Sequence, residues 1–497
     1  MIAHVLPLLA QATDPNAPIP TPELIVKPVA PELILWGAGI VGMLYEAFAR
    51  PSRRGVHLAI VLLGLAAAAA VAVQLWDWTG PAYVLGNTVA VDRFAVLATV
   101  ILCIVAAFGC LYYSHETAGA LFRGEFYPLV AFATGGMVLI TAANDLILVF
   151  LALEILSLAL YVLTGLGGRR SNEAAVKYFL LGSFSSAFFL YGVALAYGAT
   201  TSTKLNVIVG SLGGQTGSQA LALVAMGLLV IGFAFKISAA PFHMWTPDVY
   251  QGAPTPVTAY MSAATKVAAF FALMRVLDVG LQPLTWDWTP VIYAIAVISM
   301  VLGAGLAVVQ TDVKRMLAYS SVAHAGFILA GLTSANATGI RAAMFYLIAY
   351  SLMTLGAFGV TMLVAARSAE PSTSDNYDGL GARSPGLAAL MTIFLLSLAG
   401  IPPTVGFIAK VTVFSSAIAA GNWPLAVLGM LASVVAAYAY LRVVVRMYFR
   451  QPREEVVDDR AVVPQVAGLV LAVAVLVLGV FPRLVSGIIE QASILRW

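Results

Sequence analysis

The strongest constraint on this chain is a series of long apolar runs, each about as long as a membrane crossing. A transmembrane helix needs ~20 mainly apolar residues. The 497-residue chain is 61% hydrophobic and 10% charged, whereas soluble domains carry roughly 25% charged residues. We therefore predict an all-α integral membrane protein of about fourteen transmembrane helices, at approximately 32–49, 57–76, 93–113, 126–143, 146–165, 174–199, 219–248, 255–277, 290–309, 317–333, 340–366, 386–420, 424–448 and 462–482.

Two of these runs, 219–248 and 386–420, are too long for one straight crossing and contain prolines. Proline removes a backbone donor and interrupts a helix. The first run has Lys236 just before Pro241 in FAFKISAAPFHMW, and the second has Lys410 shortly after Pro402 and Pro403 in LAGIPPTVGFIAK. Non-helical backbone at membrane depth is tolerated only where it is buried in protein or lines a water-filled cavity. In transporters, interrupted helices of this kind form the ion-binding sites. Because the two runs lie five crossings apart, we predict two inverted five-helix repeats, spans 4–8 and 9–13, each with one interrupted helix.

The runs divide the chain into an extramembrane N-terminal leader at 1–30, spans 1–3 at 31–125, a first repeat at 126–277, a second repeat at 290–448, and a loop with span 14 at 449–497. The start, MIAHVLPLLA, lacks a basic segment, so we interpret it as a leader rather than a cleaved signal.

Lys and Arg gather on the cytoplasmic side of membrane proteins. When both termini are placed outside, the cytoplasmic side holds about twice as many Lys and Arg residues as the outer side. The net charge of +3 gives no reason to expect nucleic acid.

Four charged residues stand at membrane depth or beside the interruptions. Glu154 lies nine residues beyond Asp145, or about 13 Å along a helix. Lys266 lies about 16 Å into its span, whereas Lys236 and Lys410 flank the two interruptions. Nearly all other acidic residues fall in loops or at span ends, and Arg275 is assigned to the outer side. Intramembrane charges cost several kcal/mol and usually mark ion pathways, although a structural ion pair is the alternative.

One midplane carboxylate cannot neutralise several lysines, so either some lysines are neutral or acids on a neighbouring chain face them. A lysine poised between its two forms suits a proton relay. Lys177 could take part in such a relay, or its long side chain could simply reach the membrane–water interface. His243 and His324 are further candidates because histidine titrates near neutrality, although a single helical histidine is as often structural. No metal or iron–sulfur ligand spacing occurs, and Cys103 and Cys110 lie too far apart on a helix to form a disulfide.

Four segments carry a specific family resemblance: SNEAAVKYFLLGSFSSAFFLYG, FKISAAPFHMWTPDVYQGAPTPVTAYMSAATKVAAF, DVKRMLAYSSVAHAGF and LAGIPPTVGFIAKVTVF. Over residues 30 to 485 the chain resembles the proton-translocating, antiporter-like membrane subunits of bacterial respiratory complex I, NADH–quinone oxidoreductase. The resemblance implies a proton relay of Glu154, Lys236, Lys266 and Lys410. It also matches Lys177 to a family lysine, and His324 more loosely to a polar central position.

The resemblance further implies a multi-pass subunit of a bacterial cell membrane. Its partners would be the lipid bilayer and the other membrane and hydrophilic subunits of complex I. NADH, FMN, iron–sulfur clusters and quinone are implied for the whole complex, and no cofactor is expected in this chain. In the expected mechanism Glu154 stabilises charged Lys236 until quinone chemistry elsewhere weakens the pair. The proton of Lys236 then moves through Lys266, water and His324 to Lys410 and outward.

Two other functions fit the same residues. The chain could belong to a multisubunit cation/proton antiporter, which would exchange cations without NADH. It could also be a scaffold that retains the charges without conducting protons. A solute transporter fits poorly, because no polar midplane site beyond the lysines is evident.

Overall fold

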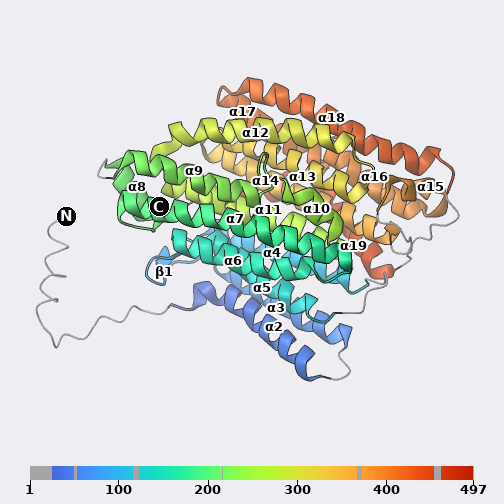
Figure 1. The fold of residues 1–497 in the computed structure, drawn as a ribbon, viewed down its shortest axis with the longest axis horizontal. Helices are drawn as coiled ribbons and strands as arrows, with labels where there is room; N and C mark the ends of the chain where they lie inside the picture. The colour runs from blue at the N-terminus through green and yellow to red at the C-terminus, as the bar shows by residue number, and fades with distance from the viewer. Residues whose placement is uncertain are drawn as a thin grey trace, which may run out of the picture.

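The computed structural model describes residues 25–49, 53–115, 123–214, 217–365, 372–452 and 461–495, so most of the predicted leader lies outside the described residues. Figure 1 shows roughly parallel helices, with α2 and α3 along one edge of the bundle and α17 and α18 along the other. The elements are η1 (Lys27–Val29), α2 (Ala30–Phe48), α3 (Arg54–Gln74), β1 (Tyr83–Val84), β2 (Val89–Ala90), α4 (Arg93–Tyr113), α5 (Phe126–Ala142), α6 (Leu146–Thr164), α7 (Arg169–Thr200), α8 (Leu205–Gly213), α9 (Gln219–Lys236), α10 (Trp245–Gly252), α11 (Thr255–Arg275), η2 (Val276–Gly280), η3 (Gln282–Leu284), α12 (Thr285–Val308), α13 (Val313–Leu332), α14 (Ala337–Ala365), η4 (Ser374–Tyr377), α15 (Leu380–Arg383), α16 (Pro385–Ala399), α17 (Val405–Ala419), α18 (Trp423–Phe449), α19 (Val462–Val480) and α20 (Arg483–Ala492).

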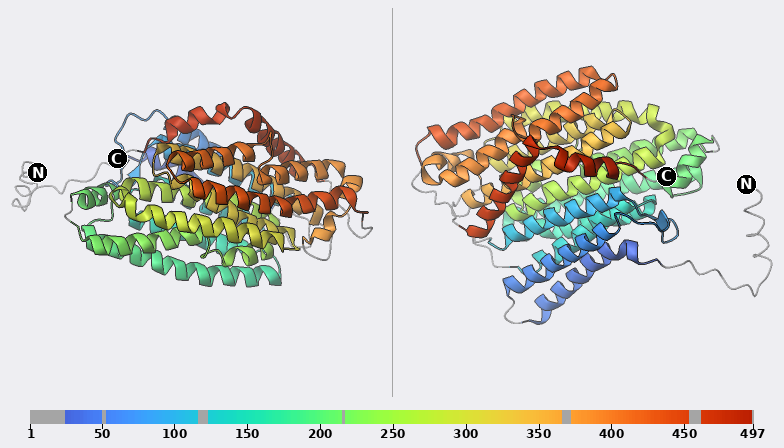
Figure 2. Two further views of the ribbon diagram at one scale, coloured as in Figure 1. Left: turned by 90° about the horizontal axis from the view of Figure 1, so that it is seen from above. Right: turned by 180° about the vertical axis from the view of Figure 1, so that it is seen from behind.

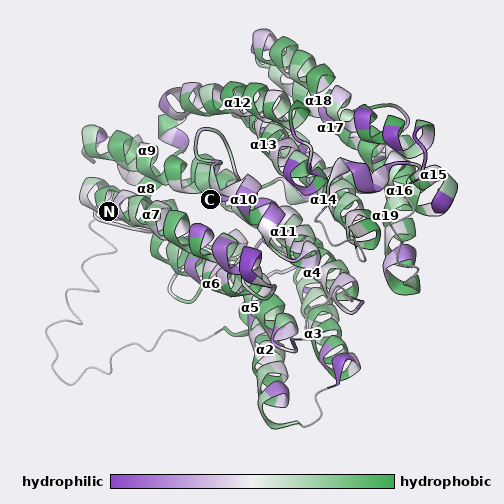
Figure 3. Cartoon of the chain, turned by 45° about the vertical axis from the view of Figure 1, so that its right-hand side comes forward, coloured by the Kyte–Doolittle hydropathy of each residue, from purple (hydrophilic) through white to green (hydrophobic). Residues whose placement is uncertain are grey.

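The helices confirm the predicted membrane fold. Eleven described helices are long and apolar enough to cross a bilayer, and three shorter apolar ones are α5, α16 and α17. Each predicted span coincides with a helix, or with a pair of helices at the two interruptions. Figure 3 shows apolar residues along most of the ribbon and hydrophilic ones mainly toward helix ends, as a bilayer requires.

Three of the crossing helices begin at an aspartate that caps them. Asp92, Asp145 and Asp312 precede α4, α6 and α13, and each side chain accepts a backbone N–H of the first turn at 2.8–2.9 Å. The first N–H groups of a helix have no partner within the helix, so such caps typically contribute about 1 kcal/mol. The caps fix where these helices enter the bundle.

Both predicted interruptions are present. The first break separates α9, which ends at Lys236, from α10, which begins at Trp245. The second separates α16 from α17, and Gly400 follows α16 with a φ of +85°. Glycine tolerates that left-handed conformation because it has no Cβ. The broken crossing is the fourth of five in both repeats, α5 to α11 and α12 to α18.

The centre of the bundle is formed by α11 and α14, the most deeply buried spans. They pack against each other, and α13 packs on α14. In the view from behind, α19 and α20 cross the back of the bundle (Figure 2), and α19 contacts α14, α16 and α17. A charged side chain on α11 therefore lies far from lipid.

Two local features were not predicted. The antiparallel hairpin β1–β2 pairs Tyr83 with Ala90 and Val84 with Val89. We call the side of the bundle that carries it the hairpin face. The short helix α8 lies on the same face. The backbone of Lys204, just before α8, forms an antiparallel β-bridge with Asp145 at the start of α6, and Val89 of β2 forms one with Ala143. The opposite side carries the start of α7 and is called here the pocket face.

Candidate functional site

The site begins at the first helix break, where Lys236 ends α9. Its side chain is 3% exposed, and its Nζ donates to Ser157 Oγ at 2.7 Å and to Tyr178 OH at 3.4 Å. Tyr178 stacks on Trp245, the first residue of α10, with ring centroids 4.5 Å apart. The aromatic pair thus holds the two halves of the broken helix around the lysine.

Glu154 lies close to this lysine but does not form an ion pair with it among the described residues. Ser186 of α7 donates to Glu154 Oε1, and Ser157 lies one turn along α6. A cavity of about 10 Å³ between them is lined by Ser157, Ser186 and Lys236. Glu154 and Lys236 are therefore each hydrogen-bonded to a serine that lines this cavity rather than to each other.

Glu154 is also partly exposed on the side of the bundle. Its neighbours on the exposed sides of α6 and α7 are apolar: Leu151 is 50% exposed, Leu158 54% and Phe184 66%. A carboxylate at membrane depth is costly when it faces lipid. This side of the bundle therefore fits a protein neighbour better than acyl chains.

Lys266, on α11, uses a carbonyl that the first break sets free. Its side chain is fully buried, and its Nζ donates to Ile237 O at 2.6 Å. Ile237 follows the last residue of α9, so its carbonyl has no helical partner. The Nζ also lies 5.7 Å from the centre of the Tyr350 ring. The helix break thus places two consecutive residues beside the buried lysines: Lys236 itself, and Ile237, whose carbonyl accepts from Lys266.

Unpartnered hydroxyls fill the space between Lys266 and His324. The rings of Tyr350 and His324 lie 5.3 Å apart. Tyr250 OH, Tyr350 OH and Ser321 Oγ are buried, and none has a hydrogen-bond partner within the described part of the chain. Buried polar atoms without protein partners are typically satisfied by internal water. The three hydroxyls therefore form a polar region between the two basic groups.

His324 lies at the centre of the second repeat and is 1% exposed. Its Nδ1 is hydrogen-bonded to Tyr346 OH at 2.8 Å, and its Nε2 lies 3.5 Å from Tyr440 OH. Tyr440 is itself hydrogen-bonded to Ser320 at 2.5 Å. Both ring nitrogens therefore face hydroxyls that can donate or accept a proton.

Lys410 ends the line at the second break. Its Nζ donates to Leu398 O at 2.9 Å, Ala399 O at 2.8 Å and Ser433 Oγ at 2.5 Å. The two carbonyls belong to the last turn of α16, where a helix has no internal partners for them. Its Nζ also lies 5.1 Å from the Phe327 ring, which contacts His324 at 5.5 Å. The structure thus brings Glu154, Lys236, Lys266, His324 and Lys410 into one line.

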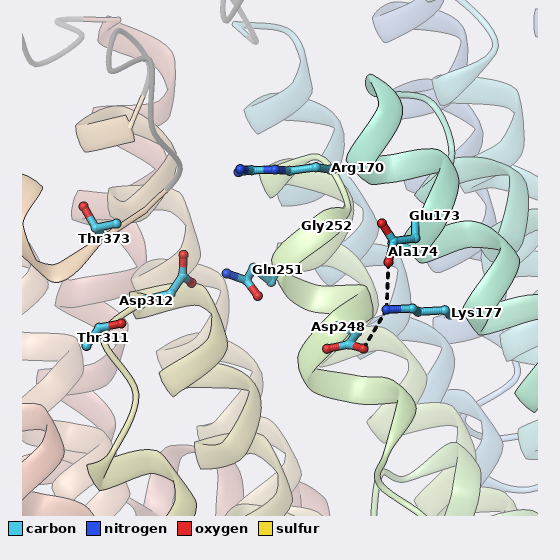
Figure 4. Close-up of a pocket in the computed structure, with 10 residues that line it drawn as sticks. All are labelled: Arg170, Glu173, Ala174, Lys177, Asp248, Gln251, Gly252, Thr311, Asp312 and Thr373. Carbon is cyan, nitrogen blue, oxygen red and sulfur yellow. Dashed lines mark hydrogen bonds and ion pairs between the residues drawn. The ribbon is translucent and has the colours of Figure 1, made fainter.

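Lys177 and His243 lie outside that line. Lys177 forms ion pairs with Glu173 at 2.9 Å and Asp248 at 3.1 Å, and its side chain is 44% exposed. Figure 4 shows these residues around a cavity of about 420 Å³ on the pocket face, between α7, α10 and the start of α13. Arg315 also donates to Asp248, at 2.6 Å. His243 is partly buried beside the first break, and its Nδ1 has no partner within the described residues.

The structure also buries charged residues that the sequence interpretation placed in loops or at span ends. Arg275, assigned to the outer side, is 1% exposed and forms a bidentate ion pair with Asp92 at 2.8 and 2.9 Å. Glu32, expected at a span end, is 3% exposed. Position near a span end did not reveal that neighbouring helices cover these two groups. Glu46, expected at the interface, is 24% exposed and accepts from buried His57 at 2.7 Å. Within the described residues no group of His, Cys, Asp and Glu has the arrangement of a metal site.

Known proteins share both the sequence and the fold of this chain. Residues 143–436 match the family described as NADH:quinone oxidoreductase/Mrp antiporter, TM. NADH-quinone oxidoreductase subunit N of Rhodococcus opacus strain B4 is 43% identical and covers 96% of this chain and 98% of its own length. A chain of respiratory complex I from Thermus thermophilus, solved with bound aureothin, is 35% identical with a TM-score of 0.78, over 92% of this chain and 98% of that one.

A chain of the Mrp complex from Dietzia sp. DQ12-45-1b has a TM-score of 0.83, over 94% of this chain and 97% of that one. At 21% identity, that likeness shows a shared fold and no more.

Proposed function

Because this chain belongs to the family of NADH:quinone oxidoreductase and Mrp antiporter transmembrane chains, we propose a function as one of its proton-translocating members. The chain acts as a membrane-arm subunit of the subunit N type in a bacterial NADH–quinone oxidoreductase. It crosses the bacterial plasma membrane many times and works with the other membrane and hydrophilic subunits of that complex. NADH, FMN, iron–sulfur clusters and quinone act in other subunits, and this chain moves protons.

The observation that carries the proposal is the row of buried charged and polar side chains that runs through both repeats. Lys236, Lys266 and Lys410 are each at most 6% exposed, and each ammonium has hydrogen-bond acceptors from backbone carbonyls or hydroxyls. Acceptors of this kind hold an ammonium in place without cancelling its charge. The charge of each lysine therefore responds to its neighbours, as a proton relay requires.

The relay starts at Glu154. In the resting state its carboxylate stabilises protonated Lys236 through Ser186 and Ser157. Quinone chemistry elsewhere in the complex alters the charge on the neighbouring subunit beside Glu154 and weakens that stabilisation. Lys236 then releases its proton toward Lys266, whose ammonium donates to the next carbonyl along the broken helix.

The second half of the relay runs through the unpartnered hydroxyls. Water held by Tyr350 and Ser321 connects Lys266 with His324, and the imidazole passes a proton between its two nitrogens. Lys410 receives the proton and releases it outward. Moving one charge against the membrane potential costs about 2.3 kcal/mol per 100 mV. The pathway must therefore be closed to backflow at each step.

We place both termini and the hairpin face outside, and the pocket face in the cytoplasm. The excess of Lys and Arg on the pocket side supports this orientation. In this orientation the cavity lined by Lys177, Asp248 and Glu173 is an aqueous entrance for protons. Lys177 then takes up protons at this entrance. His243 lies beside the first break rather than within the relay.

The test uses Glu154→Gln and Lys236→Ala in the assembled complex, in sealed membrane vesicles supplied with NADH. Each change removes a charge that the relay needs, so we expect proton translocation to slow by about tenfold or more, since ~1.4 kcal/mol of barrier corresponds to a factor of ten. Lys204→Met is the matched control, because Lys204 lies on the hairpin face and donates to Gly86 O. Normal proton-to-NADH ratios and rates in both variants would instead support a scaffold role.

The alternative function is a subunit of a multisubunit cation/proton antiporter. The fold shared with the Mrp chain favours keeping this alternative. Vesicles that contain the native assembly distinguish the two functions. Proton movement driven by a sodium gradient in the absence of NADH would support the antiporter, whereas movement that requires NADH and quinone supports the respiratory function.

A further inference from the structure

A second buried carboxyl group lies away from the relay, on the hairpin face. Glu32, in the first turn of α2, lines a cavity of about 20 Å³ together with residues of α3, α4 and β2. The lining includes Ala72, Asp92 and Thr99, and the other groups are mainly apolar. The side chain of Glu32 is 3% exposed, so it points into the protein rather than into lipid.

The carboxyl of Glu32 lacks a protein partner for one of its oxygens. Oε2 is buried without a hydrogen bond among the described residues, and so is Nε1 of Trp36, one turn further along α2. Burying an ionised carboxylate without compensation costs many kcal/mol. A polar atom in this situation is normally satisfied by water or carries a proton.

The charged groups around the cavity do not compensate a carboxylate at Glu32. Asp92 faces the same cavity, but both of its oxygens are held by Arg275. The hydroxyl of Thr99 donates to Ala95 O at 2.8 Å, and the thiol of Cys103 lies on the same side of α4. A metal cation would need several oxygen ligands, whereas the cavity has room for about one water molecule. A proton is the ligand that this site can hold.

We propose that Glu32 is a proton-binding site that exchanges its proton with water in the cavity between α2, α3 and α4. The orientation proposed above places the site at the outer surface. It is separate from the relay, because Arg275 caps α11 nine residues beyond Lys266, or about 13 Å along the helix. The Asp92–Arg275 ion pair lies between this cavity and α11.

A carbodiimide tests this site, because it reacts with protonated carboxyl groups in apolar surroundings. The carboxyl oxygen bonds to the carbodiimide carbon while the carboxyl proton goes to one of its nitrogens. The O-acylisourea then rearranges to a stable N-acylurea, and the peptide gains the mass of one carbodiimide. Native membranes that contain the assembled complex are treated with dicyclohexylcarbodiimide, and the labelled peptides of this chain are identified by mass spectrometry.

We expect label on Glu32 near pH 7, a loss of at least about tenfold at strongly alkaline pH, and no label on that peptide in Glu32→Gln. Glu490 is the control, because its side chain is 68% exposed and pairs with Arg341 at 3.6 Å, so it should stay ionised and unlabelled. An unlabelled Glu32, or label that does not change with pH, would overturn the proposal. The readout needs neither NADH nor turnover, so it stands apart from the test of the relay.

Discussion

The ion pair between Asp92 and Arg275 allows a quantitative prediction. Arg275 makes three short hydrogen bonds, two to Asp92 at 2.8 and 2.9 Å and one to Thr141 O at 2.8 Å, and both charged side chains are at most 2% exposed. Removing one partner of such a pair leaves a buried charge without compensation, which costs about 3–5 kcal/mol. Replacing both partners costs far less, because no charge remains.

Three variants separate these effects. Asp92→Asn removes the charge while keeping a side chain that caps α4, since asparagine is as good an N-cap as aspartate. Arg275→Met removes the guanidinium and keeps a long apolar side chain. In both single variants the α4 region should open at least about a hundredfold more often than in the wild type. The double variant should recover most of the lost stability.

The two cysteines report this opening. Cys103 and Cys110 lie on α4, are at most 3% exposed and form no disulfide. A thiol reagent therefore labels them only when the helix opens, and peptide-resolved mass spectrometry of the purified complex gives the rate. When closing is fast, the labelling rate follows the open population.

The neighbouring pair Arg93–Asp77 is the control, because its side chains are 39% and 83% exposed. An exposed pair typically contributes 0–1 kcal/mol, so Asp77→Asn should change the labelling rate by no more than a few-fold. Equal rates in the wild type and both buried single variants would refute the reasoning. So would a double variant that is labelled as fast as the single ones.

Further predictions follow from packing and from the relay. In Gly326→Ala the new Cβ would lie 2.7 Å from Ala296 O, so melting of the complex should reveal a loss of about 1–3 kcal/mol. Gly305→Ala meets no atom within 4 Å and should be neutral or slightly stabilising in the same assay. Tyr346→Phe removes the hydrogen bond to His324 and should slow proton translocation several-fold without loss of assembly. Lys177→Met should slow pumping most when cytoplasmic protons are scarce, and an effect independent of cytoplasmic pH would contradict an entrance role.

Much of the fold follows from the sequence because lipid leaves few choices. Backbone groups in a bilayer must be satisfied within helices, so each run of ~20 apolar residues predicts a crossing. Pro241 and Pro402 likewise predict the two breaks, because proline cannot continue the hydrogen-bond pattern of a helix. The depth of Lys266 follows from counting residues along a helix.

The contacts of the site depend on which helices meet, and one sequence does not contain that information. Asp92 and Arg275 are 183 residues apart, and nothing in the sequence around either residue indicates that the two form a pair. The serines between Glu154 and Lys236 likewise come from two different helices. A carboxyl residue near a span end, such as Glu32, is the kind of sequence signal that could have prompted a search for a buried charged group.

The side position of Glu154 constrains the protein that covers it. The carboxyl lies between exposed apolar side chains of α6 and α7. A neighbouring subunit that packs here must therefore match an apolar surface and still offer a polar or basic group to one carboxyl.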